Sequence, residues 1–500
     1  MSHIIKNLKY FLCNFILLNI LKFLLRIVFI KTLSIEYLGI NSLLLNVLAT
    51  LSLVELGVGP AIIYSLYKPL AYKDKATICA IMYFFRKIYF LIGIVILILG
   101  LIFYPWVDNL IKDGQGIPEF NYYYLLFLVN TVISYFWSYK RSIFIADQKQ
   151  YMVNKYQTIV QTFIILLQIL FLYVFQNYWY FIIIMFFGTL IENFGISNKA
   201  NKAYPYLNDI RHKLDIEIKY QISKNIKAMV YHKFGGIILF NSGNLVLSKF
   251  VGIIEVGLYS NYFMIITSLN NFAGKFFEAI IATIGNLIVT KNNEDKKLAF
   301  KLTEFITALQ ANICFCGLTV LFNPLIEIWI GVEFLFDENI IIAMSFSFYL
   351  IYMRKAVQVF HDAAGLYWND RYKPIVESIV NLVFSICLTK YYGVIGVVFG
   401  SIIGTLSTSF WIEPYVLFNN GIDIKLKDYF ADYLKFTAVA FISAFISKML
   451  YKGLFVKVTL LNFILGILIC ISITLLLWFA VFRNREEMQY LKILLKKIKK

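Results

Sequence analysis

The chain has 500 residues, of which 60% are apolar and 15% charged, and its mean hydropathy is +0.72. Soluble domains are closer to half apolar and a quarter charged, so this composition excludes most water-soluble enzymes. The net charge of +18 is typical of membrane proteins, whose inner loops collect Lys and Arg, and it does not indicate nucleic acid as a partner.

Apolar stretches long enough to cross a bilayer recur along the whole sequence. A transmembrane helix needs roughly 20 mostly apolar residues, and windows of that kind predict about fourteen spans. In chain order these spans are 11–33, 40–66, 83–107, 121–143, 155–175, 178–198, 228–249, 259–288, 303–325, 339–360, 375–391, 394–418, 432–449 and 457–482. The sequence therefore predicts an all-α integral membrane protein.

The distribution of Lys and Arg predicts the orientation of the chain. With the N-terminus inside, the loops on that side carry 37 of the 47 Lys and Arg residues, and the opposite loops carry 7. Because inner loops collect positive charge, we expect a multi-pass protein with both termini in the cytoplasm. The remaining cations, Lys22, Arg26 and Lys275, lie within predicted spans.

Two halves of the sequence repeat each other at a nearly constant offset. Lys31 and Gly39 recur 218 residues later as Lys249 and Gly257. At an offset of 216, Tyr151-x-x-Asn154-Lys155-Tyr156 recurs as Tyr367-x-x-Asp370-Arg371-Tyr372, and Gly188-Thr189-Leu190 as Gly404-Thr405-Leu406. Each copy holds six predicted spans, so both copies enter the membrane from the same side. The pattern predicts parallel repeats, an arrangement typical of secondary transporters.

The repeat divides the chain into two six-helix bundles and a C-terminal extension. The predicted lobes are residues 1–210 and 219–430, followed by two additional transmembrane helices in 431–482 and a basic amphipathic cytoplasmic tail in 483–500. For this tail, a helix resting on anionic lipid and a simple stop-anchor are equally favoured. The substrate path is expected between the two bundles.

Polar and charged side chains inside the spans mark the expected path. A charge at a span centre costs roughly 2.5–3.5 kcal/mol on insertion scales, so it usually faces a bundle interior or a watery cavity. Helical spacing puts three such residues on one face of the first span and three on one face of the eighth. They are Asn19, Lys22 and Arg26, and Asn271, Lys275 and Glu278. Because the first two spans and spans seven and eight correspond under the repeat, we expect these groups to converge.

The expected cleft is net positive and suits an anionic head group. Lys22, Arg26 and Lys275 are candidates for binding a phosphate, which Arg holds through two hydrogen bonds. Glu55, in the second span, and Glu278 either pair with the cations and hold helices together or couple an ion; the sequence favours neither. Gly57-x-Gly59-Pro60 follows Glu55 and predicts a break or kink in the helix.

Other polar residues near span ends favour structural roles. His361-Asp362 is expected to be a polar helix end, with a proton site as the less favoured alternative. Glu192, Arg354 and Glu413 are expected to anchor helices at the interface. Six scattered cysteines have no spacing typical of zinc ligands or of a set of disulfides, so we predict no metal and no cofactor.

Two stretches of the sequence resemble a known family. ELGVGPAIIYSLYKPLA (55–71) and DAAGLYWNDRYKPIVE (362–377) resemble the polysaccharide-unit (Wzx-type) flippases of the multidrug/oligosaccharidyl-lipid/polysaccharide exporter superfamily, and the predicted topology is similar along nearly the whole chain. The resemblance implies a V-shaped pair of six-helix lobes with two extra C-terminal helices. It also implies that undecaprenyl-diphosphate-linked oligosaccharide moves across the bacterial cell (inner) membrane to the outer leaflet. Implied partners are this lipid-linked glycan, membrane lipid, and polysaccharide polymerase and assembly proteins.

The resemblance also implies roles for particular residues. The family's cavity is lined by positive side chains on the first helices of each lobe, which Lys22, Arg26 and Lys275 match. Residues that match the family's inner-loop motifs are expected to order inner loops or a gate and not to contact the sugar. They are Tyr64, Tyr67, Lys68, Pro69, Asp370, Arg371 and Tyr372. A cytoplasmic network of Asp with Lys or Arg between the lobes would fit both copies of the motif.

The predicted function is a flippase for lipid-linked oligosaccharides that works by alternating access. One alternative is a peptidoglycan-precursor or multidrug transporter of the same superfamily. The precursor carries the same diphosphate, whereas a cation exporter would favour an acidic cavity. The other alternative is a membrane polysaccharide polymerase. Its catalytic groups need a sizeable outer loop, and the longest here (105–120) holds no recognisable catalytic set, so we do not expect an enzyme.

Overall fold

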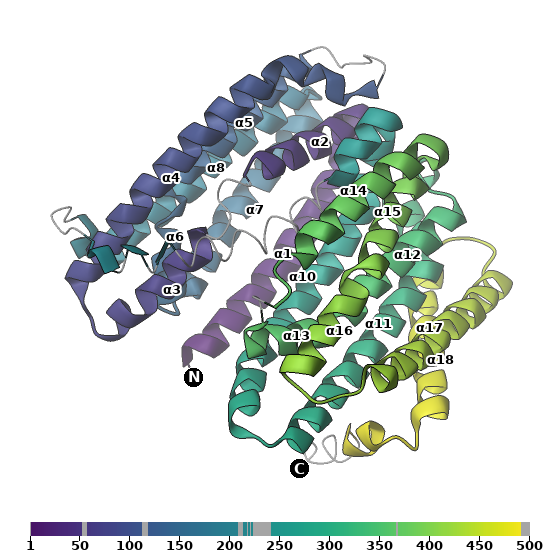
Figure 1. Cartoon of the computed structure of the whole chain (residues 1–500). Helices are drawn as coiled ribbons and strands as arrows, with labels where there is room; N and C mark the ends of the chain where they lie inside the picture. Colours follow the sequence, from purple (N-terminus) through teal and green to yellow (C-terminus); the bar gives the residue numbers. More distant parts are fainter. Residues whose placement is uncertain are drawn as a thin grey trace. The chain divides into compact units, whose positions relative to one another are not determined.

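The computed structural model describes residues 2–52, 58–112, 119–208, 214–217, 219–220, 222–223, 242–366 and 369–491. Within these ranges the chain forms helices joined by short turns, and no strand occurs (Figure 1). Nine helical segments in the described part are long and apolar enough to cross a membrane, and Ile35–Leu51 is a shorter apolar helix. The predicted all-α membrane fold is confirmed. The chain divides into two compact units, Met1–Gly257 and Leu258–Lys500.

Within the described residues of the first unit, eight α-helices and three short 3-10 turns are labelled. They are α1 (Ser2–Thr32), α2 (Ile35–Leu51), α3 (Val58–Ala71), α4 (Lys75–Phe103), η2 (Tyr104–Trp106), η3 (Asp108–Leu110), α5 (Phe120–Ser138), α6 (Arg141–Ala146), α7 (Gln150–Phe175), α8 (Tyr178–Ala203) and η5 (Pro205–Asn208). Helix α1 packs on α7, α7 on α8, and α4 and α8 both contact α5. Aromatic rings fill this core: the Phe29 ring lies edge-on to Phe181 at 5.1 Å, and Tyr123 edge-on to Tyr178 at 4.9 Å.

The second unit is built around the long helix α11. Helix α10 (Ile253–Thr290) begins at the end of the first unit and continues into the second. The following elements are α11 (Asn293–Trp329), η6 (Val332–Phe334), α12 (Glu338–Met353), α13 (Lys355–Ala364), α14 (Lys373–Tyr392), α15 (Val394–Ser407), α16 (Ser409–Asn420), α17 (Leu426–Leu454) and α18 (Leu460–Phe482). Helices α12, α17 and α18 all pack against α11, and α14 forms a close hairpin with α15.

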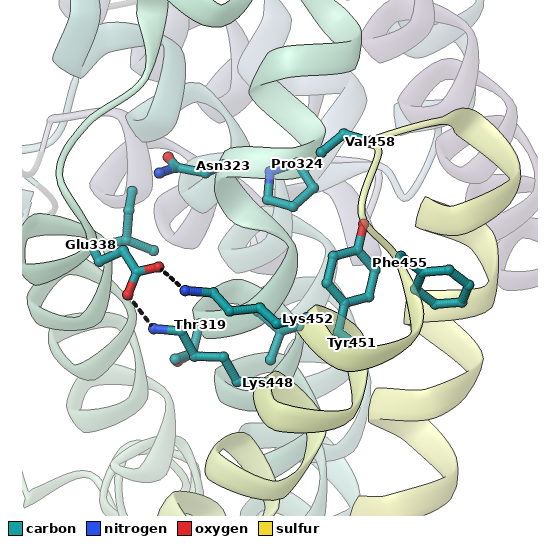
Figure 2. Close-up of a pocket in the computed structure, with 11 residues that line it drawn as sticks. Thr319, Asn323, Pro324, Glu338, Lys448, Tyr451, Lys452, Phe455 and Val458 are labelled. Carbon is teal, nitrogen blue, oxygen red and sulfur yellow. Dashed lines mark hydrogen bonds and ion pairs between the residues drawn. The ribbon is translucent and has the colours of Figure 1, made fainter.

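The helix pair α17–α18 is held to α11 by aromatic and polar contacts. The Trp478 ring stacks on Phe436 at 5.2 Å and lies 4.8 Å from Phe305, and the thiol of Cys316 contacts the Ser447 hydroxyl at 3.2 Å. At the C-terminal end of α17, a pocket of about 200 Å³ opens beside an ion pair (Figure 2). Glu338 at the start of α12 accepts hydrogen bonds there from Lys448 at 2.7 Å and Lys452 at 2.5 Å.

Within the described residues the predicted spans fall mostly on helices, but several spans are interrupted. The second predicted span corresponds to α2 and α3: α2 ends at Leu51, and α3 begins at Val58, next to Gly59 and Pro60. The tenth is divided at Arg354 into α12 and α13, and the twelfth at Thr408 into α15 and α16. Of the seventh predicted span, 228–249, only residues 242–249 lie within the described part.

The duplicated glycines Gly39 and Gly257 are close-contact positions in the first unit. A Cβ on Gly39 would lie 2.0 Å from the carbonyl oxygen of Ile253, and a Cβ on Gly257 would lie 2.7 Å from the carbonyl oxygen of Ile35. Ile35 and Ile253 are separated by the same 218 residues as the two glycines. The contact is therefore reciprocal: Gly39 meets Ile253, and Gly257 meets Ile35, the residue equivalent to Ile253 in the first copy of the repeat. A local two-fold axis produces contacts of this kind.

Candidate functional site

The candidates on the first span lie along α1 in the first unit. Asn19 is part-buried and donates a hydrogen bond to the Phe15 carbonyl at 2.7 Å. Lys22 is exposed and Arg26 is half-buried, one helical turn further along. The basic side chains therefore lie in the middle of an apolar helix, at or near its surface. Glu55 lies outside the described residues.

The matching candidates on the eighth span lie on α10. Asn271 is exposed. The helix is continuous through Lys275 and Glu278, but their side chains lie outside the description. Helix α1 belongs to the first unit and this part of α10 to the second, so the convergence of Arg26 and Lys275 on one chamber stays a prediction.

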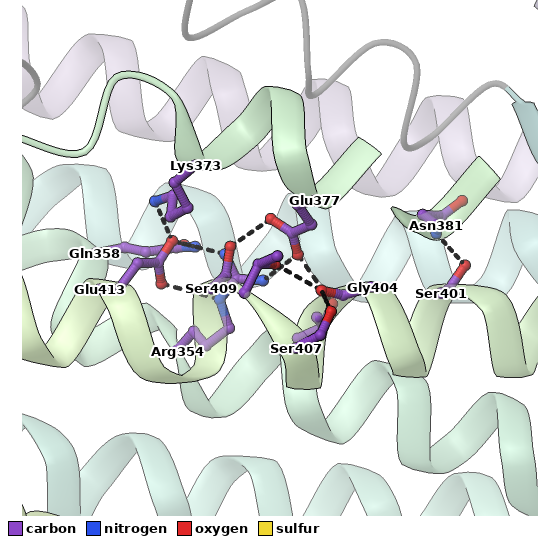
Figure 3. Close-up of polar contacts among 12 residues, drawn as sticks. Arg354, Gln358, Lys373, Glu377, Asn381, Ser401, Gly404, Ser407, Ser409 and Glu413 are labelled. Carbon is purple, nitrogen blue, oxygen red and sulfur yellow. Dashed lines mark hydrogen bonds and ion pairs between the residues drawn. The ribbon is translucent and has the colours of Figure 1, made fainter. Parts of the chain in front are cut away.

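A buried network of charges lies at the break between α12 and α13 in the second unit (Figure 3). The Arg354 guanidinium donates to both carboxylate oxygens of Glu413 on α16, through Nε at 2.9 Å and Nη2 at 2.6 Å. Its Nη1 donates to Glu377 on α14 at 3.1 Å. All three side chains are at least nine-tenths buried, so the charges lie in a medium where they interact strongly.

Hydroxyl groups and a lysine complete the network. Thr405 donates to the Glu377 carboxylate at 3.0 Å, and Ser409 donates to its other oxygen. Lys373 reaches Glu413 and Asp370, at 2.7 Å each. Every carboxylate is thus paired with at least one cation, which offsets the desolvation of buried charges.

Asp370 connects this network to His361. The His361 Nε2 lies 3.3 Å from the Asp370 carboxylate, and both side chains are almost fully buried. Burial by itself would raise the pKa of Asp370, but hydrogen bonding with His361 and the charge of Lys373 together hold the pKa below its usual value. The carboxylate is therefore charged at neutral pH. Among the described residues, no group of three or more His, Cys, Asp and Glu side chains is arranged to hold a metal ion.

The first unit contains a smaller counterpart of this network. Arg141, at the break between α5 and α6, donates to Glu192 on α8 at 2.7 Å. Gln157 and Gln161 on α7 donate to the same carboxylate at 2.8 Å and 2.5 Å. Gln161 is the repeat equivalent of Glu377, at the offset of 216. In each copy of the repeat, one arginine therefore joins the break in the fourth predicted span to the fifth and sixth spans, but the second copy carries more charge.

The motif residues 370–372 take different positions around the network. Asp370 is part of it, whereas the Arg371 guanidinium lies over the Tyr372 ring at 4.6 Å, and Tyr372 is 61% exposed. The ion pairs of the network join helices within the second unit. The expected network between the lobes therefore stays a prediction, because the two units are described separately.

Two members of the network, Glu377 and Lys373, were not singled out from the sequence. Both lie in the stretch Asp370–Ser378 that belongs to the second copy of the repeat. One signal in the sequence could have indicated them: the neutral Gln161 of the first copy corresponds to the charged Glu377 of the second. A charged carboxylate at a buried position requires a cation nearby. Arg354 and Glu413, expected as interface anchors, are instead buried partners of each other.

The motif residues of the first unit line a groove. Tyr64, Tyr67, Lys68 and Pro69 on α3 are among the residues around a hollow of about 780 Å³, together with Tyr72 and Asp74 of the turn into α4. This groove is a second candidate site, and it differs from the ion network in being open and rich in aromatic rings.

Comparisons with known proteins identify relatives by structure and not by sequence. No family model matches the chain, and no curated protein matches it. The lipid II flippase MurJ in an inward closed conformation matches with a TM-score of 0.61 and 18% identity, over 94% of this chain and 99% of that chain. An inward-facing multidrug resistance MATE family transporter of the MOP superfamily matches with a TM-score of 0.63 and 14% identity, over 80% and 94%.

A third similar structure is a variant of the Vibrio cholerae MATE transporter VcmN, with a TM-score of 0.56 and 12% identity, over 83% of this chain and 96% of that chain. At these identities the likeness concerns the fold alone, since the same fold can carry different substrates. The chain is a multi-pass membrane protein with the fold of the lipid II flippase and the MATE transporters.

Proposed function

We propose that the chain is a flippase that moves undecaprenyl-diphosphate-linked oligosaccharides across the bacterial cell membrane for surface polysaccharide synthesis. The observation that carries this proposal is the match to a lipid II flippase over 94% of this chain and 99% of that chain. A match over nearly all of both chains supports a transporter with the same overall architecture as that flippase. Polysaccharide polymerase and assembly proteins are the partners that this function implies.

The charge of α1 supports a lipid diphosphate as the transported group. Lys22 and Arg26 lie one turn apart in the predominantly apolar middle of α1, and charged side chains inside a span usually face a bundle interior or a polar path. A diphosphate that passes this helix can accept two hydrogen bonds from the Arg26 guanidinium. Binding neutralises the cations, and the loaded protein then exchanges inward-facing and outward-facing states while the polyprenyl chain stays in lipid.

A multidrug transporter is the second candidate, because the MATE structures match with similar TM-scores. Two observations favour the flippase. The MATE chains match 80–83% of this chain against 94% for the flippase. The charged side chains described within α1, Lys22, Arg26 and Lys31, are all cationic, which suits an anionic substrate better than the cationic substrate of a drug exporter. A peptidoglycan precursor carries the same diphosphate, so glycan specificity must come from elsewhere in the molecule.

A flipping assay in proteoliposomes tests the proposal. The substrate is an undecaprenyl-diphosphate-linked disaccharide with a fluorophore on the glycan, and flipping is followed by chemical quenching from the outside. The wild-type chain should accelerate flipping over protein-free vesicles. Arg26→Gln should slow it roughly tenfold or more, since it removes charge-assisted hydrogen bonds to the diphosphate, and Arg26→Lys should keep part of the rate.

Lys31→Gln is the matched control. Lys31 lies in the last turn of the same helix and is exposed, so its loss removes an equal charge away from the middle of the span and should leave the rate unchanged. Wild-type vesicles that flip no faster than empty ones would refute the function. An unchanged rate in Arg26→Gln would refute the assigned role of Arg26.

A further inference from the structure

The groove at the end of α3 is formed by an unusual concentration of exposed tyrosines. Tyr64, Tyr67 and Tyr72 are 66%, 51% and 77% exposed and line the same hollow of about 780 Å³ in the first unit. That volume falls within the range of about 300–1,000 Å³ that is typical of small-molecule sites. Aromatic side chains contribute large contact areas when they are covered by a partner, so three of them around one hollow indicate a surface that binds something.

Two of the rings contact each other, and the turn that follows them is ordered by hydrogen bonds. Tyr64 and Tyr67 are one helical turn apart, and their rings lie edge to face with centroids 6.5 Å apart. The turn that follows is fixed by Asp74, which accepts hydrogen bonds from the Thr77 amide at 3.1 Å and the Thr77 hydroxyl at 2.6 Å. Tyrosine loses little conformational entropy on binding, and a preorganised site loses less still.

The polar groups of the groove do not suit a phosphate. Among the described residues that line it, Lys68 is a cation, whereas Asp74 and Glu217 are carboxylates. The two carboxylates outnumber the one cation, so the net negative charge of these groups would repel a diphosphate. Ring faces that pack against C–H groups, combined with hydroxyl, ammonium and carboxylate groups that exchange hydrogen bonds with hydroxyls, suit a saccharide instead.

We propose that this groove binds the sugar part of the lipid-linked substrate on the cytoplasmic side, before translocation. The inference rests on the proposed function and on the Lys and Arg distribution, which puts the turn between α3 and α4 inside. It assigns Tyr64 and Tyr67 as the ring platform and Lys68 as a hydrogen-bond donor. The sequence motif around Tyr67 and Lys68 thus recognises the glycan and does more than order an inner loop.

Binding of free oligosaccharide to the full chain in detergent tests this assignment. The probe is the pool of oligosaccharides that mild acid releases from the polyprenyl-linked glycans of the host, detected by saturation-transfer NMR and titrated for affinity. The wild-type chain should bind, and Tyr64→Ala/Tyr67→Ala should lose at least tenfold in affinity. Tyr64→Phe/Tyr67→Phe should lose less, because it keeps the rings and removes only the hydroxyls.

Tyr173→Ala is the matched control, since Tyr173 is 74% exposed in the same unit but does not line the groove. Tyrosines that merely sit at the membrane interface would not affect binding of a water-soluble glycan in detergent. Absence of glycan binding by the wild type, or an unchanged affinity in both double variants, would overturn the assignment.

The two proposals fail in different ways. Arg26→Gln should flip slowly but bind free oligosaccharide with unchanged affinity, because Arg26 is assigned to the diphosphate. A wild-type chain that binds free oligosaccharide but does not accelerate flipping would refute the proposed function and leave the glycan site in place. Normal flipping with no glycan binding would remove the glycan site alone.

Discussion

Glu413 and Glu377 are similarly buried in one ion network, but because their partners differ we expect them to contribute differently to the stability of the fold. Glu413 accepts two hydrogen bonds from Arg354 and one from Lys373. Glu413→Gln would therefore leave two buried cations with too little negative charge, and removing one partner of a buried pair costs about 3–5 kcal/mol. We expect a clearly lowered Tm, measured by intrinsic tryptophan fluorescence on the purified protein.

Glu377→Gln should be the milder change. The equivalent position in the first unit is Gln161, which donates to Glu192 beside Arg141, so an amide is compatible with this architecture. Arg354 would keep both of its bonds to Glu413, and the amide could still accept from Arg354. A loss of Tm as large as that of Glu413→Gln would contradict this ranking.

The sequence singled out individual residues where a local pattern, such as the repeat, marked them. The repeat picked out Asp370, whose buried contact with Lys373 is local in sequence. The pair of Arg354 and Glu413 joins residues that are 59 positions apart, and nothing in the local pattern indicated that they meet. Likewise, Tyr64 and Tyr67 share a face of α3 and Tyr72 lies in the turn after it, but only the fold shows that the three surround a hollow.

At the scale of helices, α2 and the start of α10 can cross closely because glycine, which has no side chain, occupies the contact positions 39 and 257. Gly39→Ala would put a methyl group 2.0 Å from the backbone oxygen of Ile253. A backbone atom cannot move aside without displacing its helix, so both helices would have to separate. We expect Gly39→Ala and Gly257→Ala to lower Tm and the yield of folded protein.

Gly317→Ala is the control for this crossing. Gly317 lies inside α11, and an added Cβ there would meet nothing within 4 Å. Alanine is the better helix former by about 1 kcal/mol, so this change should leave Tm unchanged or raise it. Equal tolerance of alanine at Gly39 and Gly317 would show that the close crossing does not exist in the folded protein.

The existence of helices followed from apolar length, but their interruptions did not. Apolar length predicted the helices α4, α7 and α8, but α4 and α7 begin eight and five residues before the predicted spans, and α8 ends five residues after its span. The breaks at Arg354 and Thr408 carry no proline or glycine at the break itself. At Arg354 the break coincides with the buried ion pairs that the side chain makes with α14 and α16. Tertiary contacts of this kind are invisible to a window of hydropathy.

At the scale of the whole molecule, parallel repeats require equivalent turns to lie on the same side of the membrane. The turn at Tyr72 in the first unit corresponds to the turn near Glu294 in the second, and both residues are exposed. The Lys and Arg count predicts that both lie in the cytoplasm and that Val456, which is 96% exposed, lies outside. Single cysteines at these positions, introduced after the six native cysteines are replaced, would report their sides through a membrane-impermeant maleimide.

We expect Val456→Cys to be labelled in intact cells, and Tyr72→Cys and Glu294→Cys only after the membrane is permeabilised. This outcome requires an even number of spans between positions 72 and 294, as the predicted six spans per copy would provide. Labelling of position 294 but not of position 72 in intact cells would mean that the repeats are inverted. An alternating-access path would then have to form from opposite ends of the two units, and Arg26 and Lys275 would no longer be expected at equivalent depths.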